Sequence, residues 1–212
     1  MNVLVVKANN RPADQAISSK MYETFMENFT GVEPVVYDLF AEDTPYFGQQ
    51  YMEVFGKLAT GGVLNEEEQR LMAAKQKAMD VISAADLIVF AFPLWNLSIP
   101  AKLQTFIDYI YQSGFTFKYN EQGQQVSLMN DKKVILLNAR GGIYSTPEGA
   151  GLEMAVNYMR NVVTGVFGMQ IVDEVIIEGH NAMPAQAADL IAAGLEKVKE
   201  VAIRHSKALV TQ

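Results

Sequence analysis

The sequence predicts an α/β protein with a doubly wound, five-stranded parallel sheet and helices on both faces. Five short runs rich in β-branched and other apolar residues recur along the chain, as expected for strands covered on both faces. Segments with helical apolar spacing separate these runs, and such alternation favours parallel strands joined by right-handed crossovers. The chain has 212 residues, 50% of them hydrophobic and 19% charged, so it can form a single domain over 1–212 with a sizeable core.

The predicted elements follow one another in regular alternation. The strands are expected over residues 3–6 (VLVV), 34–39 (PVVYDL), 87–92 (LIVFAF), 134–138 (VILLN) and 172–177 (VDEVII). The helices are expected over residues 16–29, 66–85, 100–111, 151–167 and 185–209. In the first helix, Ile17, Met21 and Phe25 recur every four residues and so keep one face apolar.

Two connections are longer than the sheet requires. Residues 41–65 are rich in aromatic residues and glycines. Residues 113–131 alternate apolar and polar side chains around NEQG, which predicts a hairpin. Connections of this length in a compact domain are more often functional than not, and ordinary surface elaboration is the alternative.

The composition excludes several classes of site. The formal net charge of −7 argues against a nucleic-acid partner, which needs a basic face, and against an anionic membrane surface. The chain has no cysteine and only two histidines, His180 and His205, so disulfides, thiolate chemistry and cysteine- or histidine-rich metal sites are not expected. Neither a signal peptide nor an apolar run of about 18 residues is found, so a soluble, cytoplasmic protein is expected.

Ligands of open α/β sheets bind beyond the carboxyl ends of the strands, and three loops are expected there. The first, residues 7–21, has polar side chains ahead of a helix but no glycine, so it matches neither GxGxxG nor the P-loop. Free N–H groups, a helix dipole and hydroxyls favour one phosphate, and a polar turn with an N-cap serine is the alternative. The candidate residues are Asn10, Gln15, Ile17, Ser18 and Ser19.

The second loop follows the strand over 87–92. Its candidate residues are Pro93, Leu94, Trp95, Asn96 and Leu97. An apolar turn of this kind can lay side chains along a flat ring while Asn96 and the backbone hydrogen-bond the edge of that ring. The alternative is a strand-to-helix connection with a surface tryptophan. The ring-binding interpretation is favoured because Trp95 is the single tryptophan and lies at the functional end of the sheet.

The third loop, residues 138–145, has the sequence NARGGIYS. Gly141 and Gly142 are expected to permit positive φ and a close approach of the backbone to a ligand. Arg140 and free N–H groups are expected to place positive potential there. A tight glycine turn with a solvent-facing arginine is the alternative. Taken together, a phosphate site, an apolar ring wall and donors for a polar ring edge predict a flavin mononucleotide (FMN) site.

Four segments carry a resemblance to a known family. VKANNRPADQAIS, PLWNLSIPAKLQTFIDY, GFTFKY and NARGGIY resemble the FMN-dependent NADH azoreductase and quinone reductase family, in the same order and over nearly the whole chain. The resemblance implies a flavodoxin-like fold and a homodimer with one FMN per subunit, bound at the dimer interface. It assigns the phosphate to Ser18 with Asn10 and Gln15, and the isoalloxazine wall to residues 94–97. The residues it assigns to the pyrimidine end are Ala139, Arg140, Gly141, Gly142 and Tyr144. The first loop lacks the serine-rich run of many relatives, so its individual phosphate ligands stay open.

The resemblance also implies an activity. A hydride from NADH would pass through noncovalent FMN to quinones, giving hydroquinones, or to aromatic azo compounds, giving amines, with ping-pong kinetics. The flavin carries this chemistry, so no catalytic side chain and no metal are expected. Aromatic residues of the long connections are expected to wall the substrate pocket from the neighbouring chain. They are Tyr51, Phe55, Phe117 and Tyr119.

Some roles stay open at the level of sequence. His180 follows the last strand and is either a proton donor to the acceptor or a surface histidine, whereas His205 is expected to be solvated. A flavodoxin-type electron carrier, which NADH does not reduce directly, is the alternative from another functional class. An α/β regulatory module without a cofactor is a further alternative. The physiological acceptor and the choice between NADH and NADPH are not predicted.

Overall fold

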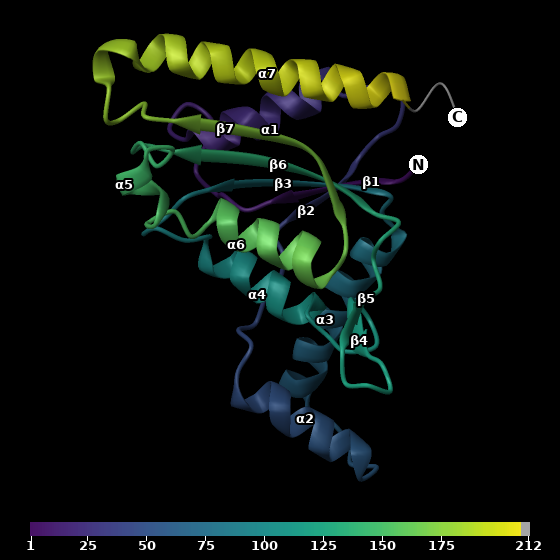
Figure 1. Ribbon diagram of the computed structural model, residues 1–212. Helices are drawn as coiled ribbons and strands as arrows, with labels where there is room; N and C mark the ends of the chain where they lie inside the picture. The colour runs from purple at the N-terminus through teal and green to yellow at the C-terminus, as the bar shows by residue number, and fades with distance from the viewer. Residues whose placement is uncertain (209–212) are drawn as a thin grey trace.

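The structure, a computed structural model, describes residues 1–208 and contains the predicted five-stranded parallel sheet (Figure 1). The strand order is β2-β1-β3-β6-β7, and every neighbouring pair is parallel. The strands are β1 (Val3–Lys7), β2 (Val35–Asp38), β3 (Leu87–Pro93), β6 (Lys133–Arg140) and β7 (Gln170–Glu178). Strand order reverses between β1 and β3, which is where open α/β sheets bind ligands.

Helices cover both faces of the sheet because alternate strand residues point into two separate cores (Figure 1). Val3 and Val5 face α1 (Ile17–Asn28) and α7 (Ala187–Ala208). Leu4 and Val6 face the opposite layer, which consists of α3 (Glu66–Ala84), α4 (Ala101–Ile110) and α6 (Val156–Arg160). A 3₁₀ turn, η2 (Pro184–Gln186), precedes α7, and the predicted end of this last helix at residue 209 lies outside the described residues.

The two long connections fold differently. Residues 113–131 contain the predicted hairpin, with β4 (Phe117–Tyr119) antiparallel to β5 (Gln125–Ser127). Residues 41–65, where no helix was predicted, contain α2 (Gln49–Ala59). This helix buries Tyr51 and Val54, and it extends away from the sheet (Figure 1). Tyr51, Val54, Phe55 and Leu58 follow helical spacing, so this helix could have been predicted from the sequence, but Phe55 and Leu58 stay exposed.

The helix predicted over 151–167 begins later than expected. Residues 147–150 form a separate short helix, α5 (Pro147–Ala150). The α6 helix starts at Val156 because the Glu153 carboxylate accepts hydrogen bonds from three N–H groups of its first turn, those of residues 155, 156 and 157. The segment then continues as a π-helix, η1 (Asn161–Val166).

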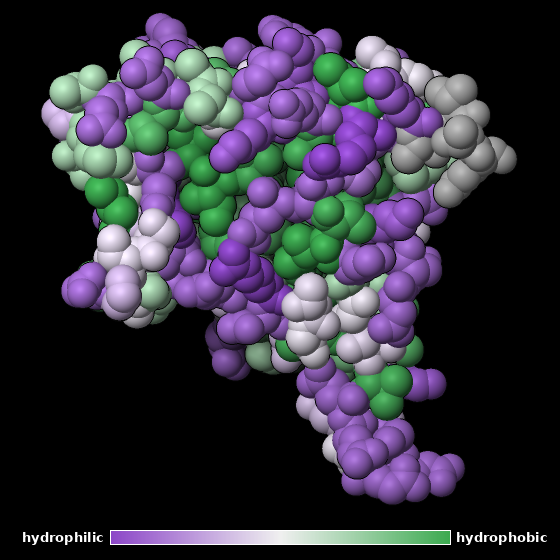
Figure 2. Space-filling view, turned by 45° about the horizontal axis from the view of Figure 1, so that its top comes forward, coloured by the Kyte–Doolittle hydropathy of each residue, from purple (hydrophilic) through white to green (hydrophobic). Residues whose placement is uncertain are grey.

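Hydrophobic side chains also reach the surface. Figure 2 shows them gathered in the middle of one face, bordered by hydrophilic side chains. Exposed large apolar residues occur on α2 and on the segment before α6, where Leu152 and Met154 are 52% and 50% exposed. None of the helices within residues 1–208 has the length and apolar character needed to cross a membrane.

Candidate active site

A cavity of about 400 Å³ lies at the carboxyl ends of β1, β3, β6 and β7. Its volume is within the range of roughly 300–1,000 Å³ that is common for small-molecule sites. The lining residues are Asn9, Arg11, Asp14, Gln15, Ala16, Ile17, Ser18, Pro93, Leu94, Trp95, Ala139, Gly141, His180 and Asn181. The three predicted loops therefore meet in one cavity, and a fourth loop, which follows β7, joins them.

The start of α1 offers hydrogen-bond donors to this cavity. Its N-cap residue, Ala16, has extended backbone and no capping side chain, and the first turn holds no acidic residue. The Ala16 carbonyl accepts from the N–H groups of Ser19 and Lys20, whereas the N–H groups of Ile17 and Ser18 have no acceptor within residues 1–208. These free N–H groups and the positive end of the helix dipole favour an anion such as a phosphate.

Two neighbouring side chains hold the first loop in shape. Asn9 is buried, and it donates from Nδ2 to Ser18 Oγ (2.8 Å) while its Oδ1 accepts from the Arg11 N–H (2.9 Å). Ser19 Oγ donates to the Arg11 carbonyl (2.6 Å), so this predicted ligand points into the loop and does not line the cavity. Asn10 is exposed and also lies outside the lining. Asn9 is not among the predicted candidates, although asparagine side chains often hydrogen-bond the backbone two residues further on.

The second loop forms a strained two-residue turn. Trp95 and Ser98 exchange two backbone hydrogen bonds (2.9 and 3.0 Å), and the residues between them, Asn96 and Leu97, have φ of 50° and 69°. Two positive φ values define a type I′ turn, where glycine is preferred to leucine. A left-handed Leu97 costs about 1–2 kcal/mol, and strain of this kind is often found at ligand sites. Pro93, Leu94 and Trp95 line the cavity, whereas Asn96 and Leu97 do not.

The third loop approaches the cavity through Gly141. The prediction of positive φ at Gly141 and Gly142 was wrong, since neither residue has it. The structure gives a different reason for a small residue at position 141: a Cβ atom there would lie 2.2 Å from Asn181 Nδ2 and would displace that side chain. The Gly141 carbonyl also accepts from the N–H groups of Asn181 and Ala182 (3.0 and 3.1 Å), so this glycine joins the loops that follow β6 and β7.

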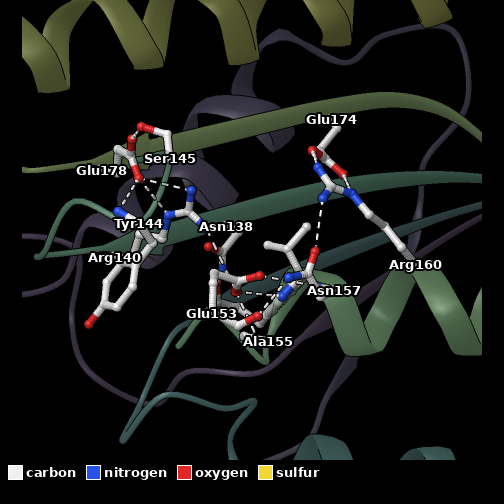
Figure 3. Close-up of polar contacts among 12 residues, drawn as sticks. Asn138, Arg140, Tyr144, Ser145, Glu153, Ala155, Asn157, Arg160, Glu174 and Glu178 are labelled. Carbon is white, nitrogen blue, oxygen red and sulfur yellow. Dashed lines mark hydrogen bonds and ion pairs between the residues drawn. The ribbon is translucent and has the colours of Figure 1, made fainter. Parts of the chain in front are cut away.

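Arg140 is buried among the polar contacts drawn in Figure 3 and does not line the cavity, which corrects the prediction of positive potential there. Its guanidinium contacts Glu178 through Nε (2.9 Å) and a terminal nitrogen (2.8 Å), and it lies 3.7 Å from Glu153. Glu178 also accepts from the Tyr144 N–H (3.0 Å) and from the Ser145 hydroxyl. Two carboxylates thus face the single guanidinium, so its positive charge is compensated within this network. Gly142 and Tyr144 lie beside this network and outside the cavity lining.

This network also sets the charge state of Glu178. Partial burial acts to raise its pKa, but the hydrogen bonds from Ser145 and Tyr144 and the nearby Arg140 guanidinium outweigh it, so the pKa is lowered. Glu178 is therefore ionised at neutral pH. The ionised carboxylate ties the segment after β6 to the end of β7.

The two histidines occupy different environments. His180 lines the cavity, and its buried Nδ1 has no hydrogen-bond partner within residues 1–208. Burial lowers the pKa of His180, so its imidazole is neutral at pH 7. His205 was predicted to be solvated, but its Nε2 lies 2.5 Å from Asp173 and its side chain is only 14% exposed. Within the described chain, no group of three potential ligands among His, Cys, Asp and Glu can hold a metal ion.

The four predicted substrate-pocket aromatics do not line the cavity of their own chain. Tyr51, on α2, is buried against Phe55 of the same helix and against Phe47, which precedes the helix. Phe117 is buried in the β4–β5 hairpin, which lies near the amino ends of the strands (Figure 1). Phe55 and Tyr119 are exposed, at 41% and 61%, so these two can reach a neighbouring chain.

Comparisons with known proteins give consistent results. Residues 1–202 match the family described as having a flavodoxin-like fold. The chain is 48% identical over 204 residues to "FMN-dependent NADH:quinone oxidoreductase 3" of Bacillus cereus, covering 94% of this chain and 97% of that protein.

Solved structures agree with the sequence relatives. The azoreductase AzrA matches with a TM-score of 0.87 and 47% identity, over 96% of this chain and 100% of the other. An azoreductase from Bacillus anthracis matches with a TM-score of 0.87 and 45% identity, over the same shares. The strand order, the cavity at the carboxyl ends of the strands and these similarities lead to one assignment: the chain belongs to the flavodoxin-like fold family.

Proposed function

We propose that the protein is an FMN-dependent oxidoreductase that passes a hydride from NADH to quinones and to aromatic azo compounds. One observation carries the proposal: a single cavity is lined by the uncapped start of α1, by Leu94 and Trp95, and by Gly141, whose N–H has no acceptor within residues 1–208. The names of the relatives support the same activity, since they are an NADH:quinone oxidoreductase and two azoreductases.

The residues of the cavity fit the parts of FMN. The free N–H groups of Ile17 and Ser18, with the Ser18 hydroxyl, would hold the phosphate. Leu94 and Trp95 would line the isoalloxazine, and the Gly141 N–H, which has no acceptor within residues 1–208, would donate to the polar edge of the ring. The orphaned Nδ1 of His180 offers a further polar contact. The first loop lacks the glycine pattern that a dinucleotide needs, which supports FMN over FAD.

When bound, FMN supplies the hydride-accepting and hydride-donating chemistry that the side chains lack. The chain's own part is to bind and orient reactants at the open side of the cavity. Donor and acceptor would use that side in turn, which predicts ping-pong kinetics. Backbone donors at Gly141 would stabilise negative charge that develops at the polar ring edge, as an oxyanion hole does. No side chain need act as a nucleophile, in keeping with the absence of cysteine.

We also propose a twofold homodimer in which each chain helps to wall its partner's cavity. Support comes from the exposed apolar side chains of Phe55, Leu58 and Met154, since large exposed apolar patches mark interfaces or ligand grooves. A closed twofold contact is the commonest arrangement of soluble oligomers. Sedimentation at micromolar concentration tests this proposal, and a fully active species with the mass of one chain would contradict it. The cytoplasmic location and the lack of a nucleic-acid partner stay predictions.

The activity is tested in two steps. Heat release and chromatography of the flavin from purified protein should give FMN, and FAD as the main flavin would contradict the proposed fit. Initial rates at varied NADH and fixed levels of 1,4-naphthoquinone should then give parallel reciprocal plots. A flavodoxin-type carrier would instead stay oxidised when mixed with NADH alone.

A further inference from the structure

A second groove, of about 550 Å³, shares Trp95 with the cavity. Its walls are mainly aromatic and apolar and include Phe40, Tyr46 and Ile99. The Phe40 and Trp95 rings lie 6.3 Å apart between centroids, at 69° to each other. Tyr46 is 72% exposed. The groove and the cavity therefore adjoin at Trp95.

One cation lines this groove. Lys102 Nζ lies 5.6 Å from the centroid of the Phe40 ring and makes one weak hydrogen bond, to the Glu42 carbonyl (3.4 Å). Within residues 1–208, no carboxylate oxygen lies within 4.0 Å of this nitrogen. Lys102 is partly buried, so part of its hydration is already lost. An anion beside it would therefore interact more strongly than in open water.

The Asp43 carboxylate lies near Lys102 but forms no ion pair with it. Arg70 is paired with Asp43 (2.6 Å), and Lys77 is paired with Glu42 (2.5 Å). These two pairs are balanced, so the groove keeps one positive charge, although the whole chain has a formal net charge of −7. An overall negative chain repels anions at long range, and screening limits that repulsion to about 10 Å at ordinary salt. A local cation in an aromatic groove therefore selects ligands that join a planar ring to an anionic group.

We propose that this groove is an acceptor subsite, in which Lys102 binds the sulfonate or carboxylate of an aromatic electron acceptor and the rings of Trp95 and Phe40 contact its aromatic part. That the bound molecule accepts electrons rests on the proposed function, but the binding of an aromatic anion beside Lys102 does not. NADH also joins rings to anionic phosphates, so the experiment separates the two sources. The proposal predicts a preference for sulfonated or carboxylated quinones and azo compounds over uncharged ones.

Calorimetry on the FMN-loaded, oxidised protein tests the binding. The probe is naphthalene-2-sulfonate, and the uncharged control is naphthalene-2-sulfonamide. Lys102→Gln should weaken binding of the sulfonate about fivefold to tenfold, the effect of losing one partly exposed charged contact, and should leave sulfonamide binding within twofold. Lys102→Arg should keep the preference. Lys133→Gln, at the exposed amino end of β6, removes the same net charge and should have no such effect.

Three results would overturn the proposal. The first is unchanged sulfonate binding in Lys102→Gln, and the second is equal weakening of both probes in that variant. The third is an equal effect of Lys133→Gln, which would make net charge the cause. Weakened NAD⁺ binding with unchanged sulfonate binding would assign the groove to the donor and would equally count against an acceptor subsite.

Kinetics then separate this proposal from the proposed function. The ratio of kcat/KM for 1,4-naphthoquinone-2-sulfonate to that for 1,4-naphthoquinone should fall about fivefold to tenfold in Lys102→Gln, and less at high salt. An unchanged ratio in an active enzyme refutes the acceptor subsite alone. Failure of the wild-type protein to reduce either quinone refutes the proposed function, while the calorimetric preference for the sulfonate still decides whether the anion site exists.

Discussion

Two arginine–glutamate pairs connect β7 to neighbouring segments and differ chiefly in burial (Figure 3). The Arg140 side chain, paired with Glu178, is 6% exposed, whereas the Arg160 side chain, paired with Glu174, is 46% exposed. Replacing one partner of a buried ion pair costs about 3–5 kcal/mol, because the other charge is left uncompensated. Removing an exposed pair costs at most about 1 kcal/mol. We therefore expect Arg140→Met to destabilise the fold far more than Arg160→Met.

The structure places the expected cost of Arg140→Met at the lower end of this range, about 3 kcal/mol. Both carboxylates keep other donors when the guanidinium is removed. Glu178 retains the Tyr144 N–H and the Ser145 hydroxyl, and Glu153 retains three N–H groups at the start of α6. Adding Glu178→Gln to Arg140→Met should recover part of the loss, since it removes one of the orphaned charges.

Urea unfolding of the FMN-free protein measures these differences. Arg140→Met should lower the midpoint without changing the slope, and Arg160→Met serves as the matched control. Equal small losses in the two variants would contradict this expectation, because they would mean that water compensates the charges left when the Arg140 guanidinium is removed. A double variant less stable than Arg140→Met alone would show that Glu178 is not a source of the cost.

Three further predictions concern the cavity and the Glu178 network. Gly141→Ala should weaken FMN binding about tenfold, because the added Cβ displaces the Asn181 side chain. Gly151→Ala serves as the control and should leave FMN binding unchanged, because a Cβ there meets open space. Fluorescence titration of FMN measures both variants. Because the pKa of Glu178 is lower in the folded protein than its ordinary value of 4.5, its ionised carboxylate stabilises the fold above pH 4.5. This stabilisation is lost as the pH falls through the pKa of the folded state. Acid unfolding followed by circular dichroism should therefore be less steep in Glu178→Gln, and an unchanged acid limb would contradict this sign. His180→Leu should weaken FMN binding about fivefold to tenfold, while His180→Gln, which keeps a polar group, should lose less; equal losses would show that its Nδ1 makes no contact.

The sheet and the position of the site could be predicted from local patterns. Continuous apolar runs indicate buried strands. The loops that follow these strands lie at one edge of the sheet because the strands are parallel. Trp95 and Ser18 therefore came together in the cavity as predicted. These inferences need only the sequence near each strand.

The roles within the third loop depended on contacts across the chain. Arg140 lies opposite Glu178 in the β6–β7 register, and Asn181 follows three residues later. Neither partner can be found from the RGG segment itself, so the buried ion pair and the reason for Gly141 were both missed. The left-handed Leu97 is a similar case. Its carbonyl accepts from the Met154 N–H (3.0 Å), a distant contact that helps to hold a conformation leucine avoids.

The most direct test of the central claim is an anaerobic titration of the purified protein followed in the visible spectrum. We expect one FMN per chain, bleaching of the flavin absorbance by one equivalent of NADH, and full return of that absorbance on addition of one equivalent of 1,4-naphthoquinone. Ser18→Ala, which removes the hydroxyl beside the free N–H groups of α1, should show the same spectral changes with weaker flavin retention. A protein that takes up no FMN, or that holds FMN which NADH does not reduce, would contradict the account.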